Sequence, residues 1–142
     1  MQLVFLWIVL LCHPGSQLQT RPTDLDSKGH VNNARYIEFL QAGRWEWLAA
    51  KGLTEERLKA LGVTFVVARV EIDYKAECGY PEILTIHTEV LRIGSKSLTI
   101  HQRIMKASGA VAAAGSVVLV AVDPQTHRSR ALPAELVQVL SQ

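Results

Sequence analysis

The sequence is poor in cysteine and has almost no excess charge. Its 142 residues contain two cysteines, Cys12 and Cys78, which lie far apart and form no Cys-x-x-Cys pair. This excludes a disulfide scaffold and offers no ligand spacing for zinc, so we expect no metal site and a reducing, cytoplasmic environment. The formal net charge is +2, whereas a nucleic-acid-binding protein shows a basic stripe. We therefore expect no nucleic-acid partner, and interpret Arg128 and Arg130 as part of a solvated loop.

The sequence also lacks an apolar run long enough to span a membrane. Residues 3–12 (LVFLWIVLLC) are all apolar, but a spanning helix needs roughly 20 such residues. The run has the length of a signal-peptide core, although no Lys or Arg precedes it and no small-x-small cleavage site follows it. Three interpretations stay open: a signal peptide, a buried strand, or residues from an upstream start that are foreign to the domain. We expect no stable membrane span.

Nothing in the composition indicates disorder. Hydrophobic residues make up 49% of the chain and charged residues 20%, which is an ordinary globular mixture. A chain of this length forms one domain and can bury roughly 68–70% of its unfolded surface. We expect the domain to cover residues 16–142 and treat residues 1–15 as an apolar segment of uncertain status.

The longest helical pattern runs from His30 to Lys51. Asn32 or Asn33 is suited to cap its first turn, and Gly52 is suited to end it. Its apolar residues recur at spacings typical of an amphipathic helix: Val31, Ala34, Ile37, Leu40, Trp45 and Leu48.

Three residues inside this helix suggest how it packs. Gly43 costs about 1 kcal/mol relative to alanine in a helix, and such a glycine often marks a close approach to another backbone. We therefore expect Gly43 to lie against a sheet. Trp45 and Trp47 are interpreted as packing residues.

The rest of the chain reads mainly as strands. A short strand is expected at residues 17–21 and a short helix at 54–61. The later segments alternate between apolar and polar residues or are continuously apolar, as strands do: 66–74, 84–90, 98–104 and 110–122. Within the first of these, a buried face is expected from Val66, Ala68, Val70, Ile72 and Tyr74. A terminal helix is expected at residues 133–140.

The order of these elements predicts the fold class. Four strands joined by short turns must pair as hairpins, so the sheet is mainly antiparallel. A long helix with one apolar face and a sheet with one apolar face bury each other. We therefore expect an α+β fold, with a curved antiparallel sheet wrapped around a long central helix.

Two carboxylates, Asp24 and Asp26, lie just before the start of this helix. The first amides of a helix are unpaired and carry partial positive charge, so they can hold a developing oxyanion. A neighbouring carboxylate can attack a substrate or activate water. The alternative is that both side chains cap and solvate a turn, and spacing alone favours this structural role.

The segment DLDSKGHVNNARYIEFLQAGRWEWL, which begins at Asp24, decides between these interpretations. Its pattern Asp-x-Asp-x-x-Gly-His-Val-Asn-Asn-x-x-Tyr resembles the acyl-CoA thioesterases of the 4-hydroxybenzoyl-CoA thioesterase family, in the hotdog-fold superfamily. The resemblance covers roughly residues 17–140 and includes residues 70–74, 90–94 and 119–123. It implies a hotdog fold and an enzyme that hydrolyses an acyl thioester, carried by CoA or by acyl carrier protein, in fatty acid metabolism.

The resemblance also implies roles for individual residues. Asp26 corresponds to the catalytic carboxylate, as nucleophile or general base, and the backbone N–H of Asn33 polarises the thioester carbonyl. His30 is included among the catalytic candidates because it helps to shape the loop and position water. The residues expected to contact substrate are Gly29, Val31, Asn32 and Tyr36. No cofactor is needed, because a thioester is already activated. The active site of related proteins lies between protomers, which implies a homodimer or a tetramer of dimers.

Two features depart from the family pattern. The first strand of the family is longer and alternates, which residues 1–15 do not. The loop at residues 76–82 (AECGYPE) lacks the family's usual Tyr-Gly-Asp, so substrate choice can differ. Two alternative functions stay open: a hotdog enoyl-CoA hydratase or dehydratase using His30, and a non-catalytic protein that binds acyl thioesters.

Overall fold

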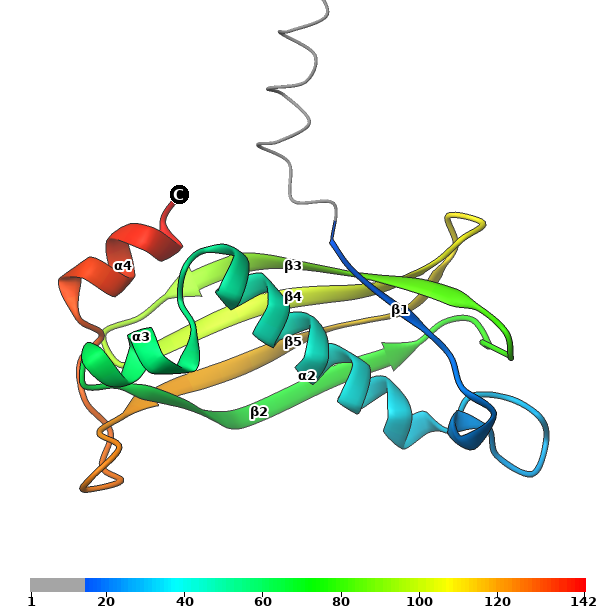
Figure 1. Cartoon of the computed structure of the whole chain (residues 1–142), viewed down its shortest axis with the longest axis horizontal. Helices are drawn as coiled ribbons and strands as arrows, with labels where there is room; N and C mark the ends of the chain where they lie inside the picture. The colour runs from blue at the N-terminus through cyan, green and yellow to red at the C-terminus, as the bar shows by residue number, and fades with distance from the viewer. Residues whose placement is uncertain (1–14) are drawn as a thin grey trace, which may run out of the picture.

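The computed structural model describes residues 15–142, which form one antiparallel sheet with helices on one face and at one end. The strands are β1 (Ser16–Gln19), β2 (Thr64–Tyr74), β3 (Ile83–Ile93), β4 (Ser97–Lys106) and β5 (Val111–Val122). The helices are the 3-10 turn η1 (Pro22–Asp24), the long α2 (Asn33–Ala50), and the short α3 (Glu55–Ala60) and α4 (Ala134–Leu140). The strand order in the sheet is β1-β3-β4-β5-β2, so β2 and β1 form its two edges. Figure 1 shows these elements.

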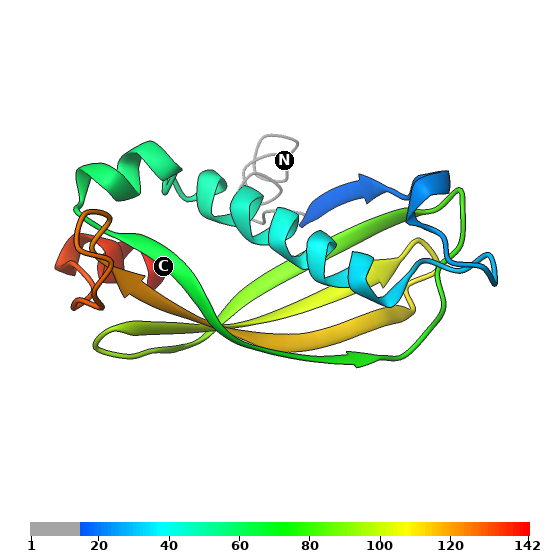
Figure 2. The same ribbon diagram turned by 90° about the horizontal axis from the view of Figure 1, so that it is seen from below.

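Helix α2 lies across one face of the curved sheet, as the two perpendicular views in Figures 1 and 2 show. The close approach expected at Gly43 is confirmed. A Cβ atom on Gly43 would lie 2.4 Å from Cγ2 of Ile86 on β3. Only glycine therefore allows α2 to pack this close to β3. The predicted α+β architecture, with a curved antiparallel sheet around a long helix, is therefore confirmed.

The start of α2 differs from the prediction by three residues. Asn32 is the N-cap, since its side chain accepts a hydrogen bond from the amide of Ala34 (2.9 Å). His30 lies in a bend, and Val31 pairs with Leu25 as an isolated antiparallel bridge, so neither belongs to the helix. The helical spacing of Val31 was therefore coincidental. At the other end, Gly52 adopts φ +76° and stops the helix as expected.

The alternation predicted for β2 holds for only part of the strand. Val70 and Ile72 are partly buried and pack on the core, but Val66 and Tyr74 are 45% and 49% exposed. The register shifts between Val67 and Arg69 where β2 pairs with β5, and such a bulge changes which side chains face the core. β2 also has no partner on its outer side within residues 15–142, so its N-terminal half presents apolar side chains to solvent.

The two tryptophans of α2 have different surroundings. Trp47 is 7% exposed and belongs to a core cluster with α3, α4, β4 and β5. Trp45 is 58% exposed, so the prediction that it packs in the core is wrong for the single chain. The periodicity predicted an apolar helix face correctly but could not tell which part of that face meets the sheet.

The remaining expectations are largely confirmed. β5 lies inside the sheet, between β4 and β2, and a Cβ on Gly115 would lie 1.9 Å from the Glu71 carbonyl oxygen of β2, so this position requires glycine. The strand expected at residues 17–21 is β1, paired with β3. The interpretations of residues 1–14 lie outside the described residues. None of the helices within residues 15–142 is both long and apolar enough to cross a membrane.

Candidate active site

The segment that joins η1 to α2 is a closed loop fixed by its own backbone. The amide of Asp26 donates to the His30 carbonyl oxygen (2.7 Å), and the amide of Gly29 donates back to the Asp26 carbonyl oxygen (3.1 Å). Gly29 has φ +80°, a conformation that side chains disfavour. The amide of Asn32 donates to the Asp24 carbonyl oxygen (2.8 Å). These bonds tie the position of Asp26 to the first residues of α2.

The Asp26 carboxylate is held ionised by this loop. Its Oδ1 accepts hydrogen bonds from the amides of Lys28 (2.8 Å) and His30 (3.2 Å). The hydrogen bond from Lys28, with a smaller contribution from that of His30, lowers the pKa of Asp26 below its ordinary value of 3.8. The residue is exposed, so it presents a charged oxygen to whatever binds at the loop.

Asp24 occupies a different environment from Asp26. Its side chain is fully buried and accepts from the Arg21 amide (2.7 Å) and the Arg21 guanidinium (3.1 Å), with Arg35 Nε at 3.7 Å. Asp24 thus ties the loop to the first turn of α2. These contacts are those of a structural residue, the role that spacing alone favoured for both carboxylates.

The first turn of α2 leaves a free donor beside this loop. Within residues 15–142, the amide of Asn33 has no hydrogen-bond acceptor, while the amides of Ala34 and Arg35 donate to Asn32. The Asn33 carbonyl oxygen accepts from the Tyr74 hydroxyl at the end of β2 (3.0 Å). The partial positive charge of a helix start and one unpaired amide are the elements of an oxyanion site.

Two of the expected substrate-contacting residues are buried in the single chain. Val31 and Tyr36 are 5% and 4% exposed and belong to a core cluster with Cys78. The Tyr36 ring packs edge-on against Tyr74, with centroids 5.3 Å apart. Burial raises the pKa of the Tyr36 phenol and also that of the Cys78 thiol, which argues against Cys78 as a reactive group. Val31 and Tyr36 thus lie in the buried core beneath the candidate site.

The loop at residues 76–82 contacts the Asp26 loop, which the sequence did not predict. Glu77 Oε2 lies 3.2 Å from His30 Nε2, and the Cys78 carbonyl oxygen accepts from the Val31 amide (2.8 Å). The His30 ring is therefore directed at Glu77, while its amide serves Asp26. The only sequence signal was the departure of this loop from the family pattern.

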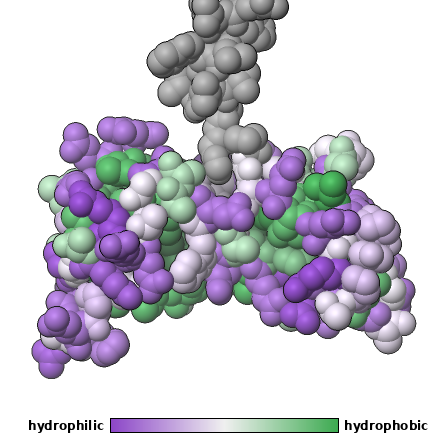
Figure 3. All heavy atoms as spheres, viewed as in Figure 1, coloured by the Kyte–Doolittle hydropathy of each residue, from purple (hydrophilic) through white to green (hydrophobic). Residues whose placement is uncertain are grey.

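A groove of about 610 Å³ lies toward the other end of α2, between α2, α3 and the start of β2. Its walls are mainly apolar, from Trp45, Leu48, Leu58, Phe65 and Val67. The volume is within the range of small-molecule sites, roughly 300–1,000 Å³. Figure 3 shows apolar side chains open to solvent between polar ones on this face. The sequence did not predict the groove, because three separate elements form it.

One buried cation lies in the wall of this groove. Arg44 is 5% exposed, and its Nη1 donates to Oε1 of the fully buried Gln102 on β4 (3.2 Å). The amide nitrogen of Gln102 donates to the Leu40 carbonyl oxygen and to the Thr88 hydroxyl, both at 3.0 Å. Burial lowers the pKa of Arg44. This polar network separates the two apolar core clusters.

No group of three His, Cys, Asp or Glu side chains within residues 15–142 is arranged to hold a metal ion. The site of the described chain consists of a carboxylate, a helix start and, at a distance from them, an apolar groove.

A curved antiparallel sheet around one long helix is the architecture of the hotdog-fold thioesterases. The solved structure of a DHNA-CoA thioesterase from Staphylococcus aureus superimposes with a TM-score of 0.82 at 19% identity, over 89% of this chain and 87% of that one. The YbaW probable thioesterase from Escherichia coli superimposes with a TM-score of 0.78 at 32% identity, over 90% of this chain and 96% of that one.

Sequence comparison identifies the family. The model of the thioesterase-like superfamily matches residues 20–140. The long-chain acyl-CoA thioesterase FadM of Escherichia coli K12 is 33% identical over 128 residues, which are 89% of this chain and 96% of that protein. The acyl-CoA thioester hydrolase YbgC of Escherichia coli O6:H1 is 33% identical over 84% of this chain and 89% of that protein. The chain belongs to the thioesterase-like superfamily.

Proposed function

We propose that this protein hydrolyses acyl-CoA thioesters to a free acid and CoA, with Asp26 as the reacting carboxylate. The observation that carries the proposal is the ionised Asp26 carboxylate in a loop fixed to the unpaired amide of Asn33. Relatives at 33% identity are named acyl-CoA thioesterases or thioester hydrolases, which supports the same reaction class. An acyl-CoA substrate also fits the cytoplasmic location expected from the sequence and a role in fatty acid metabolism.

The geometry suggests how each group contributes. The Asn33 amide donates to the thioester oxygen and stabilises the oxyanion that forms there, an effect typically worth about 2.7–4 kcal/mol. The Asp26 carboxylate either attacks the carbonyl carbon, forming an anhydride that water then cleaves, or removes a proton from an attacking water. In both routes the C–S bond breaks, and CoA leaves as a thiolate that takes up a proton. No cofactor is required.

The neighbouring residues have supporting roles in this scheme. Gly29 gives the loop its φ of +80°, and Asn32 caps the helix next to the unpaired Asn33 amide. His30 supplies an amide to Asp26, and its ring, paired with Glu77, borders the same loop and helps to position water. Val31 and Tyr36 form the buried support beneath the site.

A second copy of the chain completes the site in this proposal. Asn33 lies at the C-terminal end of β2, where Tyr74 binds it, while the groove is at the N-terminal end, at Phe65 and Val67. β2 is an edge strand with exposed apolar residues, including Val66. If two β2 edges pair antiparallel, the groove of one copy lies beside the Asp26 loop of the other. The proposed enzyme is thus a homodimer, or a tetramer of dimers, and the groove receives the acyl chain.

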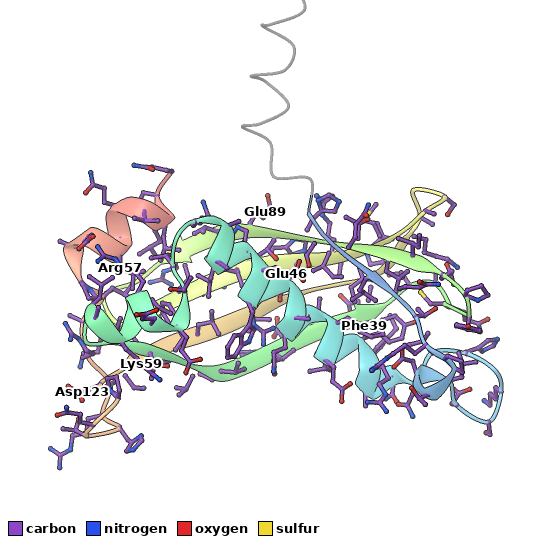
Figure 4. All side chains as sticks on the ribbon, viewed as in Figure 1. Phe39, Glu46, Arg57, Lys59, Glu89 and Asp123 are labelled. Carbon is purple, nitrogen blue, oxygen red and sulfur yellow. The ribbon has the colours of Figure 1, made fainter. Side chains whose placement is uncertain are left out.

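The decisive experiment compares two aspartates in similar local settings. Like Asp26, Asp123 accepts two backbone amides, those of Gln125 (2.8 Å) and Thr126 (3.1 Å), and the hydrogen bonds from Thr126 and Gln125 lower its pKa. It lies at the opposite end of the molecule from the Asp26 loop (Figure 4). Asp26→Asn is expected to lower thiol release from acyl-CoA by about 10²–10⁴-fold, whereas Asp123→Asn retains activity.

The outcomes separate the alternative functions. Full thiol release by folded Asp26→Asn would exclude Asp26 from the mechanism. Hydration of an enoyl-CoA without thiol release by the wild type would indicate the hydratase. Tight acyl-CoA binding with no turnover would indicate a binding protein.

A further inference from the structure

The groove at the C-terminal half of α2 contains a buried charge without a counter-ion. Arg44 is 5% exposed, and its pKa is lowered by burial alone, with no contribution from an acidic partner. Within residues 15–142 its only bonded protein partner is the neutral amide of Gln102. A buried charge without a counter-charge is costly, so such an arrangement is best explained by an acid that arrives from outside the chain.

The acidic residues nearest the groove are engaged elsewhere. Glu46 accepts a hydrogen bond from the Ser16 hydroxyl on β1, which is at the opposite edge of the sheet from β2. Glu55 forms an ion pair with Lys59, one turn along α3 (3.2 Å). Neither carboxylate neutralises Arg44.

The Arg44 guanidinium is hydrogen-bonded on the side that faces Gln102. Gln102 accepts from Arg44 through its oxygen, and both of its amide hydrogens are used by Leu40 and Thr88. No side-chain nitrogen in the described part of the chain is both buried and unpaired. The donors of Arg44 that have no protein partner in this part of the chain are therefore not fully enclosed, and Arg44 lines the groove. Gln102 lies on β4, two strands inward from the β2 edge. Arg44, which binds Gln102, therefore marks the inner end of the groove.

We propose that the preferred substrates are thioesters of dicarboxylic acids, whose second carboxylate binds Arg44 at the inner end of the groove. A guanidinium and a carboxylate form two parallel, charge-assisted hydrogen bonds, and the apolar walls hold the methylene chain between the two ends. This inference rests on the proposed thioesterase function and on the groove as the acyl site. It identifies Arg44 as the residue that selects substrates by the group at the end of the acyl chain, opposite the thioester.

The test compares two CoA esters of equal length with the full-length wild-type protein. Dodecanedioyl-CoA is expected to have a kcat/KM at least about 10-fold above that of dodecanoyl-CoA, because a methyl end would leave Arg44 dehydrated and unpaired. Equal values, or a preference for dodecanoyl-CoA, would overturn the proposal without any variant.

Three variants locate the effect. Arg44→Met is expected to abolish the preference by lowering kcat/KM for the dicarboxylic ester and raising it for dodecanoyl-CoA, because a methyl end then meets no unpaired guanidinium. Arg44→Lys keeps the charge and part of the preference. Arg103→Met removes an exposed cation on the outer face of β4 and is expected to keep the wild-type ratio. A folded Arg44→Met protein that keeps the full preference would contradict the proposal.

Failure of the proposed function gives a different result. If the wild type hydrolyses neither ester, the thioesterase proposal fails, and the dissociation constants of the same two esters can be measured through the fluorescence of Trp45, which lines the groove. Tighter binding of dodecanedioyl-CoA, lost in Arg44→Met, would support the role of Arg44. Equal binding would overturn it.

Discussion

The two ends of α2 satisfy their polar groups in opposite ways. At the N-terminal end, the buried Asp24 has Arg21 and Arg35 beside it, and the exposed Asp26 is bonded to its own loop. At the C-terminal end, the buried Arg44 has only the neutral Gln102. The first end presents a rigid, charged loop, and the second provides a cavity with an unmatched charge. Antiparallel pairing of two copies, as proposed above, would bring the loop of one copy beside the cavity of the other.

The largest expected effect comes from keeping the two ends of different copies apart. Val66 is 45% exposed on the β2 edge. Val66→Lys places a charge in the proposed seam, twice by symmetry, and is expected to give a monomer with thiol release reduced by about 100-fold or more, since orientation of the substrate is lost. Sedimentation velocity and the acyl-CoA assay measure the two effects.

A matched control is available on β3. Leu91 is 57% exposed, and Leu91→Lys adds the same charge away from the β2 edge, so both assembly and activity should persist. A wild-type protein that is monomeric and fully active would refute the composite site, as would a Val66→Lys dimer with normal turnover.

The fold was predictable because it depends on local periodicity, whereas the β2 edge and the groove were not. The spacing of apolar residues predicted α2, alternation predicted β2, β3 and β4, and a continuous apolar run predicted β5. The same alternation placed Val66 and Tyr74 inside, because it carries no information about the bulge between Val67 and Arg69. Trp45 was misplaced for a related reason: an apolar position has the same sequence signal whether it faces the core or an open groove.

The candidate site likewise contains residues that the sequence could group and contacts that it could not predict. Asp26, His30 and Asn33 are close in sequence, so a motif could group them, and the loop bonds bring them together in space. Glu77 reaches His30 from a distant loop, and Arg44 meets Gln102 across 58 residues. Contacts of this kind depend on strand order and helix placement, which one sequence without an alignment does not specify.

A medium effect on stability and activity is expected from the residues that cap the helices at the two ends, α2 and α3. Asn32 caps α2 by accepting from the Ala34 amide, and Thr54 caps α3 by accepting from the Arg57 amide (3.2 Å). Each substitution to alanine is expected to lower the free energy of unfolding by about 1 kcal/mol, measured by urea denaturation.

Activity should separate the two variants although stability does not. Asn32→Ala disturbs the turn that presents the Asn33 amide, so kcat is expected to fall by about 10-fold, a part of the value of one oxyanion donor. Thr54→Ala lies beside the groove and is expected to raise KM more than it lowers kcat. Equal kinetic effects of the two variants would contradict the assignment of chemistry to one end and chain binding to the other.

The smallest effect concerns pH and the Asp26 carboxylate alone. The amides of Lys28 and His30 stabilise its charged form, so its pKa lies below 3.8, and the active, ionised form persists as the pH falls until that lowered pKa is reached. The acid limb of the kcat/KM profile of the folded protein is therefore expected to lie at a lower pH than an ordinary aspartate would give, and Asp123→Asn should leave it unchanged. An acid limb near or above about pH 5, more than one unit above an ordinary aspartate, would show that a different group controls turnover or that substrate binding removes Asp26 from its loop amides. Since the folded-state pKa is lowered, protonation of Asp26 is also expected to lower the free energy of unfolding as the pH falls through that pKa.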